Sequence, residues 1–328
     1  MKELCIALLL LMAFSRKVSA ETFTAWNLED IVHPELKKYF MMMPGIGLSS
    51  EILQYVREGM TPSPESLPKD ESVDVRNEIL PSGLRVRVYT PKTEKAEYPG
   101  LLWIHGGGHF SGTPEYTEWL QLAFVKEIGC IVVAPAYRFA PENPYPADVE
   151  DCYEALTWMA EKLPVRKDRV AVVGGSAGGG LSAAMTLIAR DKGGPAIHFQ
   201  ALFYPQLDCR MNTPSSYQIA DNRATGRNIC LTSWKWYLGD LSGDVPVYAS
   251  PALEKDLSGL PAAYIMVGGI DPFKDEAITY AQRLMQAGVP VELHVIPGAY
   301  HAFDQLLDPA ISVKIRNEYI NAIKEALQ

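Results

Sequence analysis

The chain has 328 residues, of which 48% are hydrophobic and 21% charged, with 25 glycines and 24 prolines. This composition is typical of a globular protein and excludes collagen, a coiled coil and long disorder, while five cysteines are too few for a disulfide scaffold. The net charge of −9 argues against partners such as nucleic acid or anionic lipid, because both require clustered Lys and Arg. We therefore expect a small-molecule partner that is neutral or cationic.

The first twenty residues resemble a secretory signal peptide. Lys2 precedes an apolar run over 5–14, and small residues at 18–20 stand where a signal peptidase cleaves. The run of ten residues is about half of what a bilayer-spanning helix needs, so we predict no stable membrane anchor. We expect a secreted or extracytoplasmic protein. The alternatives are a short amphipathic helix of a capping element and a cytoplasmic location, because Arg16 and Lys17 are unusual so near a cleavage site.

Strands and helices alternate along most of the chain. Apolar residues recur at three- and four-residue steps over 149–163, 278–285 and 311–327, which predicts helices, and Gly288 stands where a helix C-cap belongs. This alternation implies right-handed crossovers and an α/β fold with a mostly parallel central sheet flanked by helices. The predicted strands are 73–80, 86–89, 101–104, 131–134, 170–173, 199–204, 263–267 and 291–296.

Two stretches do not fit the alternation. Residues 21–72 begin with a helical pattern and end in a Pro-rich run, and residues 208–258 are too long for a plain connection between two strands. We interpret both as segments of a helical cap, the second as a lid insertion. The catalytic core then comprises 73–207 and 259–328. The Met41-Met42-Met43 triplet fits core packing and a flexible apolar wall over a pocket equally well.

The strongest local motif is Gly174-Gly175-Ser176-Ala177-Gly178, which follows the strand over 170–173 and precedes a helical pattern. In this context Gly-x-Ser-x-Gly is a nucleophile elbow, in which a tight turn exposes the serine hydroxyl at the start of a helix. By itself the motif also fits a glycine-rich turn with an incidental serine.

A glycine run follows the strand over 101–104. In His105-Gly106-Gly107-Gly108, the absence of side chains leaves backbone N–H groups free to face a negative oxygen that develops on a bound carbonyl. We predict an oxyanion hole made of Gly107, Gly108 and Ala177. The alternative is a flexible loop without a partner.

An acid and a histidine complete a Ser–acid–His order. Asp271 follows the strand over 263–267, and His301 follows the strand over 291–296. We predict that Asp271 orients His301, which accepts the proton of Ser176. Asp275 is the alternative acid, although it looks like the cap of the next helix.

Together the motifs resemble the hormone-sensitive-lipase-like branch of the α/β-hydrolase superfamily, over about residues 73–328. The resemblance implies a carboxylic-ester hydrolase without cofactor, with Ser176, Asp271 and His301 as its triad. Two departures stand out: the family usually has Asp at the position of Gly175, and Asn is common at the position of Gly180. The motifs that carry the resemblance are His105-Gly-Gly-Gly108, Tyr137-Arg-Phe-Ala-Pro-Glu142, Gly174-Gly-Ser-Ala-Gly-Gly179, Asp271-Pro-Phe-Lys-Asp-Glu276 and Tyr300-His-Ala-Phe303.

The remaining candidates concern the pocket, metals and cysteines. We predict no metal site, because three glycines between His105 and His109 preclude the helix that would bring the two rings together. Cys209 and Cys230 lie in one irregular segment, and spacing alone does not establish a disulfide between them. The predicted substrate pocket contains Met42, His109, Tyr204, Trp234 and Tyr237, although anchoring of the cap is the commoner role for its aromatic residues.

The sequence thus predicts a serine carboxylesterase that transfers an acyl group in two steps and acts on small esters of short to medium acyl chains. An amidase or deacetylase of the same fold is the first alternative, because the bond cleaved depends on the leaving group and the pocket shape. A non-catalytic receptor on the hydrolase scaffold is a second alternative, and the presence of His301 argues against it. The sequence predicts neither the natural substrate nor the oligomeric state.

Overall fold

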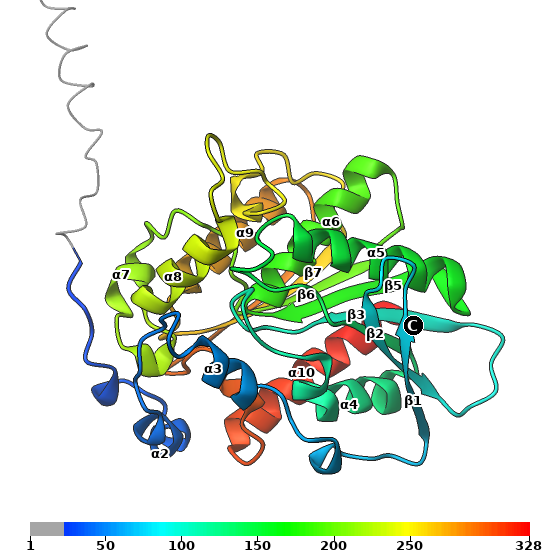
Figure 1. The fold of residues 1–328 in the computed structure, drawn as a ribbon, viewed down its shortest axis with the longest axis horizontal. Coiled ribbons are helices and arrows are strands. Elements are labelled where there is room, and N and C mark those ends of the chain that lie inside the picture. The colour runs from blue at the N-terminus through cyan, green and yellow to red at the C-terminus, as the bar shows by residue number, and fades with distance from the viewer. Residues whose placement is uncertain (1–22) are drawn as a thin grey trace, which may run out of the picture.

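Eight strands form one sheet in the order β1-β2-β4-β3-β5-β6-β7-β8 (Figure 1). This computed structural model describes residues 23–328, so the predicted signal peptide over 1–20 lies outside the described residues. Strand β2 runs antiparallel to β1 and β4, and every other neighbouring pair is parallel, which confirms the mostly parallel sheet. The strands are β1 (Val73–Ile79), β2 (Arg85–Pro91), β3 (Tyr98–Ile104), β4 (Ile131–Pro135), β5 (Val165–Gly175), β6 (Phe199–Phe203), β7 (Ala262–Gly268) and β8 (Val291–Ile296).

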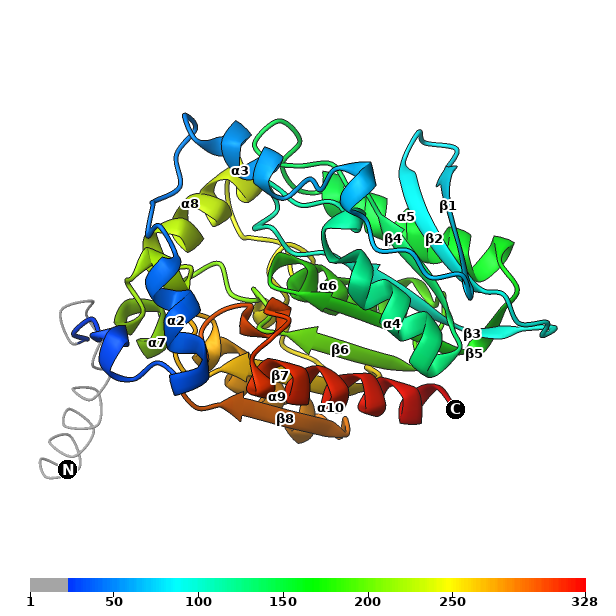
Figure 2. The same ribbon diagram turned by 90° about the horizontal axis from the view of Figure 1, so that it is seen from below.

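Helices cover both faces of the sheet, and the alternation of side chains along the strands assigns them to a face. Leu101 and Trp103 of β3 pack with α4 and α10, whereas Leu102 and Ile104 of the same strand pack with α5 and α6 (Figure 2). Successive strand residues point to opposite faces, so these pairs belong to two separate cores. The helices are α4 (Glu118–Ile128), α5 (Ala147–Lys162), α6 (Ala177–Lys192), α9 (Lys274–Gln286), which packs on β7 and β8, and α10 (Ala310–Leu327).

Four further helices lie at the end of the molecule toward which β6 and β8 point (Figure 2). We call them the cap helices: α2 (Pro34–Met42) and α3 (Leu53–Gly59) come from 21–72, and α7 (Pro214–Gln218) and α8 (Arg227–Leu238) come from 208–258. The two segments are joined to each other, because Arg223 forms an ion pair with Glu29 at 3.0 Å. Short 3-10 helices are η3 (Leu28–Asp30), η4 (Pro64–Ser66), η5 (Pro114–Thr117), η6 (Asn222–Ala224), η7 (Pro251–Leu253) and η8 (Phe303–Gln305).

Within residues 23–328, no helix combines the length and the hydropathy that crossing a bilayer requires.

Candidate active site

Ser176 stands at the sharp turn between β5 and α6. Its backbone has φ 58° and ψ −124°, a strained conformation for a residue with a side chain. The flanking glycines are required by contact: a Cβ on Gly174 would lie 2.3 Å from the carbonyl oxygen of Gly178, and a Cβ on Gly178 would lie 2.0 Å from that of Ile104. The Gly-x-Ser-x-Gly motif therefore packs its turn against the end of β3.

Three side chains from separate loops meet at this turn. His301 follows β8, and its Nε2 lies 2.8 Å from Ser176 Oγ. Asp271 follows β7, and its Oδ2 lies 2.8 Å from His301 Nδ1. The carboxyl ends of parallel strands share one edge of a sheet, which is why residues 125 positions apart become neighbours.

The surroundings of Asp271 fix the orientation of the histidine. The Asp271 side chain is fully buried, and its second oxygen accepts the N–H of Phe273 at 2.8 Å. A carboxylate at Nδ1 favours the imidazole tautomer that carries its proton there, which leaves the Nε2 lone pair facing Ser176. The rings of Tyr204 and Phe273 pack edge-on against His301 at 4.8 and 5.3 Å. The imidazole is thus held by packing as well as by hydrogen bonding.

Hydrogen bonds to two carbonyls orient the glycine loop after β3. The Gly106 carbonyl lies 2.7 Å from His105 Nδ1, and the Gly107 carbonyl accepts the N–H groups of Phe110 and Ser111. In a trans peptide the N–H points away from the preceding carbonyl, so the N–H groups of Gly107 and Gly108 face the opposite direction. Among the described residues, neither N–H group has a protein acceptor.

Ala177 supplies a third free donor, because the first N–H groups of a helix have no partner within it. Gly107, Gly108 and Ser176 all line one cavity. The three predicted oxyanion donors therefore belong to the loop and to the helix start that flank the serine.

His105 acts on this loop as a neutral side chain. Burial lowers the pKa of His105 to about 4, so the ring is uncharged near pH 7. The carbonyl of Gly106 can only accept, so Nδ1 carries the single ring proton. The ring also stacks on Tyr137 at 4.3 Å between centroids, and this contact fixes its plane.

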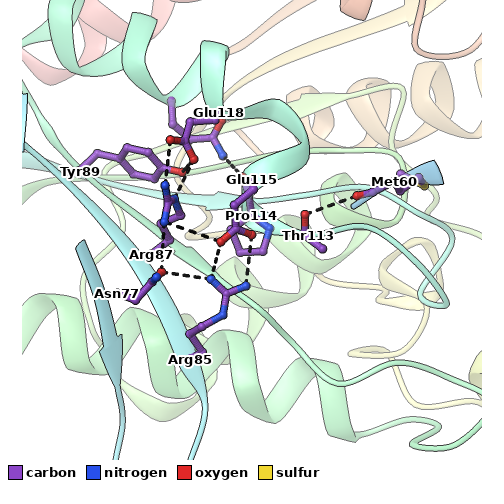
Figure 3. Close-up of polar contacts among 10 residues, drawn as sticks. Met60, Asn77, Arg85, Arg87, Tyr89, Thr113, Pro114, Glu115 and Glu118 are labelled. Carbon is purple, nitrogen blue, oxygen red and sulfur yellow. Dashed lines mark hydrogen bonds and ion pairs between the residues drawn. The ribbon is translucent and has the colours of Figure 1, made fainter. Parts of the chain in front are cut away.

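An ion network holds η5 and the start of α4 against β2 (Figure 3). Arg87 donates to both carboxylate oxygens of Glu118 at 2.7 and 2.9 Å, and Tyr89 donates to the same carboxylate. Arg85 pairs with Glu115 one turn earlier. The network positions η5, whose last residue Thr117 lines the cavity beside Ser176.

The cavity measures about 250 Å³ and is walled by core loops and by cap helices. Val56 and Met60, from α3 and its end, and Ile229 and Ser233, from α8, are part of this wall. The full lining set is Val56, Met60, Gly106, Gly107, Gly108, Phe110, Ser111, Tyr116, Thr117, Ser176, Tyr204, Gln206, Thr225, Ile229, Cys230, Ser233, Phe273, His301, Ala302 and Gln305.

Of the five residues predicted to line the pocket, Tyr204 does so. Met42 is 74% exposed, because α2 buries the stripe of Leu36 and Phe40 and Met42 lies off that stripe. Met42 therefore does not line this cavity, contrary to the prediction that it belongs to the substrate pocket.

The structure also corrects the predictions for three buried aromatic residues. His109 bonds to Asp148 at 2.7 Å and stacks on Tyr237, with Trp234 beside them, so these rings join α8 to the core next to the cavity rather than line it.

Several lining residues escaped the sequence analysis. Gln206 lies three residues after the end of β6, so its place near a strand end was a usable signal. Ser233 has no such signal, because it lies within a helix whose buried face depends on tertiary packing. Among the cysteines that the structure describes, Cys209 and Cys230 form no disulfide with each other or with another, and Cys230 lines the cavity.

The family model and the similar proteins agree on an α/β-hydrolase fold and on esterases. A family model described as alpha/beta hydrolase fold matches residues 101–305. Esterase LipI of Mycobacterium tuberculosis is 37% identical over 230 residues, which are 68% of this chain and 72% of the relative. Carboxylesterase NlhH of the same organism is 37% identical over 251 residues, 74% of this chain and 78% of the relative.

Solved structures are similar over still more of the chain. A bacterial heroin esterase superposes with a TM-score of 0.83 at 36% identity and covers 90% of this chain and 98% of its own. Esterase LipW from Mycobacterium marinum superposes with a TM-score of 0.81 at 31% identity, over 92% of this chain and 98% of its own. The range matched by the family model, 101–305, includes Ser176, Asp271 and His301.

Proposed function

Because the chain belongs to the hormone-sensitive-lipase-like esterases of the α/β-hydrolase fold and is a carboxylic-ester hydrolase, we propose that Ser176, His301 and Asp271 are its catalytic triad. The observation that carries the proposal is the chain of two 2.8 Å contacts from the Ser176 hydroxyl through His301 to Asp271. Gly107, Gly108 and Ala177 form the oxyanion hole. Their unused N–H groups beside the serine support this role.

The reaction proceeds in two acyl-transfer steps. Ser176 Oγ attacks the ester carbonyl carbon while His301 Nε2 accepts the hydroxyl proton, and the carboxylate of Asp271 stabilises the imidazolium. The carbonyl oxygen becomes negative and is stabilised by the N–H groups of the oxyanion hole. When the tetrahedral intermediate collapses, the imidazolium donates its proton to the leaving alcohol. Water then hydrolyses the acyl-enzyme by the same route.

The cavity wall favours small, uncharged esters with short to medium acyl chains. Among residues 23–328, its lining contains no Asp, Glu, Lys or Arg, so a charged ligand group would be buried there without a partner, at a large cost in free energy. Its volume of about 250 Å³ is below the usual range of roughly 300–1,000 Å³ for pockets that bind drug-sized ligands. Val56, Met60, Phe110 and Ile229 give this wall its apolar character.

The central experiment replaces the proposed nucleophile and each of the two candidate acids. Ser176→Ala should abolish the burst of nitrophenol from p-nitrophenyl butyrate, and Asp271→Asn should lower kcat by about 10⁴-fold, as loss of the orienting carboxylate does in serine proteases. The matched control is Asp275→Asn, because the Asp275 carboxylate accepts the N–H of Ser215 at 2.7 Å. We expect its kcat to stay within a few fold of the wild type. Full activity of Ser176→Ala, or an Asp275→Asn loss as large as that of Asp271→Asn, would overturn the proposal.

The substrate range needs a separate measurement. Turnover over p-nitrophenyl esters from acetyl to dodecanoyl should be highest for the short and medium chains and fall for the longest. A matched anilide tests the amidase alternative and should react much more slowly than its ester. Equal turnover of anilide and ester would assign the amidase activity instead.

A further inference from the structure

Cap helix α8 contacts Gly108, one of the proposed oxyanion donors, and the next residue, His109. Ser233 Oγ donates to the carbonyl oxygen of Gly108 at 2.8 Å. The ring of Tyr237 stacks on that of His109, with 3.7 Å between centroids and 8° between planes. Ser233 and Tyr237 are four residues apart and so lie on one face of the helix. That face of α8 therefore rests on Gly108 and His109.

Gly108 needs an external partner because it has no side chain to restrict its backbone. Its φ is +59°, and that of Gly107 is +122°, both in the region that favours glycine. The peptide before Gly108 is held inside the loop, through the Gly107 carbonyl and the N–H groups of Phe110 and Ser111. The peptide after Gly108 is held by Ser233, which belongs to the cap. Two peptides meet at the Gly108 Cα, and each has its own anchor.

The same serine is linked to the nucleophile. Gln206 Nε2 donates to Ser233 Oγ at 3.3 Å, and the backbone N–H of Gln206 donates to the carbonyl of Ser176 at 3.0 Å. Gln206 also packs tightly on α6, since a Cβ on Gly180 would lie 2.1 Å from the Gln206 carbonyl oxygen. Hydrogen bonds thus connect the nucleophile to the glycine loop after β3, by way of Gln206 and Ser233.

We propose that Ser233 is a positioning residue through which cap helix α8 sets the orientation of the Gly108 backbone in the oxyanion hole. This inference rests on the proposed function, because it assigns Ser233 a role only through the donors at Gly107 and Gly108. Ser233 itself transfers no proton. The docking of α8 therefore affects the geometry of the hole as well as the shape of the cavity.

The test replaces Ser233 and follows transition-state binding. Removing a whole oxyanion donor costs about 10²–10³ in kcat, so loss of an anchor should cost less, about tenfold. We expect Ser233→Ala to lower kcat about tenfold on p-nitrophenyl butyrate with KM within twofold. The affinity for a trifluoromethyl ketone, which forms a tetrahedral adduct on serine, should fall by the same factor as kcat/KM. Ser233→Thr, which keeps the hydroxyl, should recover most of both losses.

The control is Thr232→Ala, because Thr232 is half-buried and its hydroxyl donates to the carbonyl of Asn228 within the same helix. It should leave kcat and ketone affinity unchanged, and thermal melting of all variants checks folding. A raised KM with unchanged kcat in Ser233→Ala would overturn the inference and make Ser233 a wall residue only. The inference would also be overturned if Thr232→Ala lowered kcat and ketone affinity as much as Ser233→Ala does.

Ser176→Ala, measured in parallel, separates the two proposals. Activity in Ser176→Ala would refute the proposed function. If Ser176→Ala is inactive and Ser233→Ala has the same kcat and KM as the wild type, only the positioning role is refuted.

Discussion

His105 is a buried residue whose protonation state affects both the glycine loop after β3 and the stability of the protein. Its Nδ1 lies 2.7 Å from the Gly106 carbonyl oxygen, and its Nε2 has no partner among the described residues. Protonation would place a positive charge in a fully buried site, where the attraction of Glu115 is opposed by the positive charge of Arg85. Burial therefore lowers the pKa of His105 from 6.5 to about 4.

This pKa predicts a pH-dependent loss of stability. As the pH falls below 6.5, the unfolded chain binds a proton at His105 that the folded chain excludes until the pH approaches 4. The free energy of unfolding should therefore decrease by about 1.4 kcal/mol per pH unit in this window. In His105→Asn, the amide can still donate to Gly106 but does not titrate. Urea denaturation at pH 7, 6 and 5 measures the free energy of unfolding of both proteins. As the pH falls, the free energy of unfolding of the variant should rise relative to that of the wild type. A constant difference between the two would contradict the prediction.

The sequence was sufficient to predict the residues whose position depends on strand ends. Ser176, Asp271 and His301 each follow a strand of the parallel sheet, so their meeting follows from topology. Met42 and Trp234 lie on helices, where the buried face depends on packing that a single sequence does not contain. The glycine at 180 also has a structural reason that the sequence could not give, because the Gln206 carbonyl occupies the space where a side chain would be.

At the scale of elements, seven of the eight strands were predicted to within three residues of their ends, β5 begins at Val165 rather than at 170, and α4 was not predicted. Apolar runs bounded by turn residues mark the strands clearly. Helix α4 gives no clear stripe of its own. It buries Glu118 and Gln121 together with its apolar residues, and half-buried Trp119 also packs against the same core. Periodicity identifies a helix only when one face is polar.

The attachment of α4 to β2 predicts a large mutational effect. Arg87→Met leaves the Glu118 carboxylate, which is 3% exposed, without its cation. Loss of one partner of a buried pair costs about 3–5 kcal/mol. The double variant Arg87→Met/Glu118→Leu removes both charges and should recover most of that loss. Arg76→Met, at an exposed pair with Glu78, should cost less than about 1 kcal/mol. Urea denaturation measures all three, and equal losses for Arg87→Met and Arg76→Met would contradict the prediction.

At the scale of the whole molecule, Arg57 joins the N-terminal cap segment to the core. From α3 it pairs with both oxygens of Glu142 and donates to the carbonyls of Phe110 and Ala140. Its neighbours Val56 and Met60 line the cavity. Arg57 therefore links this part of the cavity wall to two core loops.

Arg57→Met should loosen α3 without unfolding the sheet. Loss of charge-assisted bonds worth about 1.5–3 kcal/mol predicts amide exchange roughly 10- to 100-fold faster over residues 53–60. Amides of β5 should be unaffected. Gln54→Met is the control, because Gln54 bonds only to Glu58 on the same exposed face. Unchanged exchange over 53–60 in Arg57→Met, or equal acceleration in Gln54→Met, would show that Arg57 does not hold the helix.

The uncharged wall of the cavity has a consequence for the end of the catalytic cycle. An ester enters as a neutral molecule, but hydrolysis converts its acyl half into a carboxylate. In the described part of the chain, no Lys or Arg lines the cavity to retain that anion, and the chain as a whole carries a net charge of −9. The product is thus less well solvated inside the enzyme than in water, which favours its departure. The same lining that selects the substrate limits inhibition by the acid that is formed.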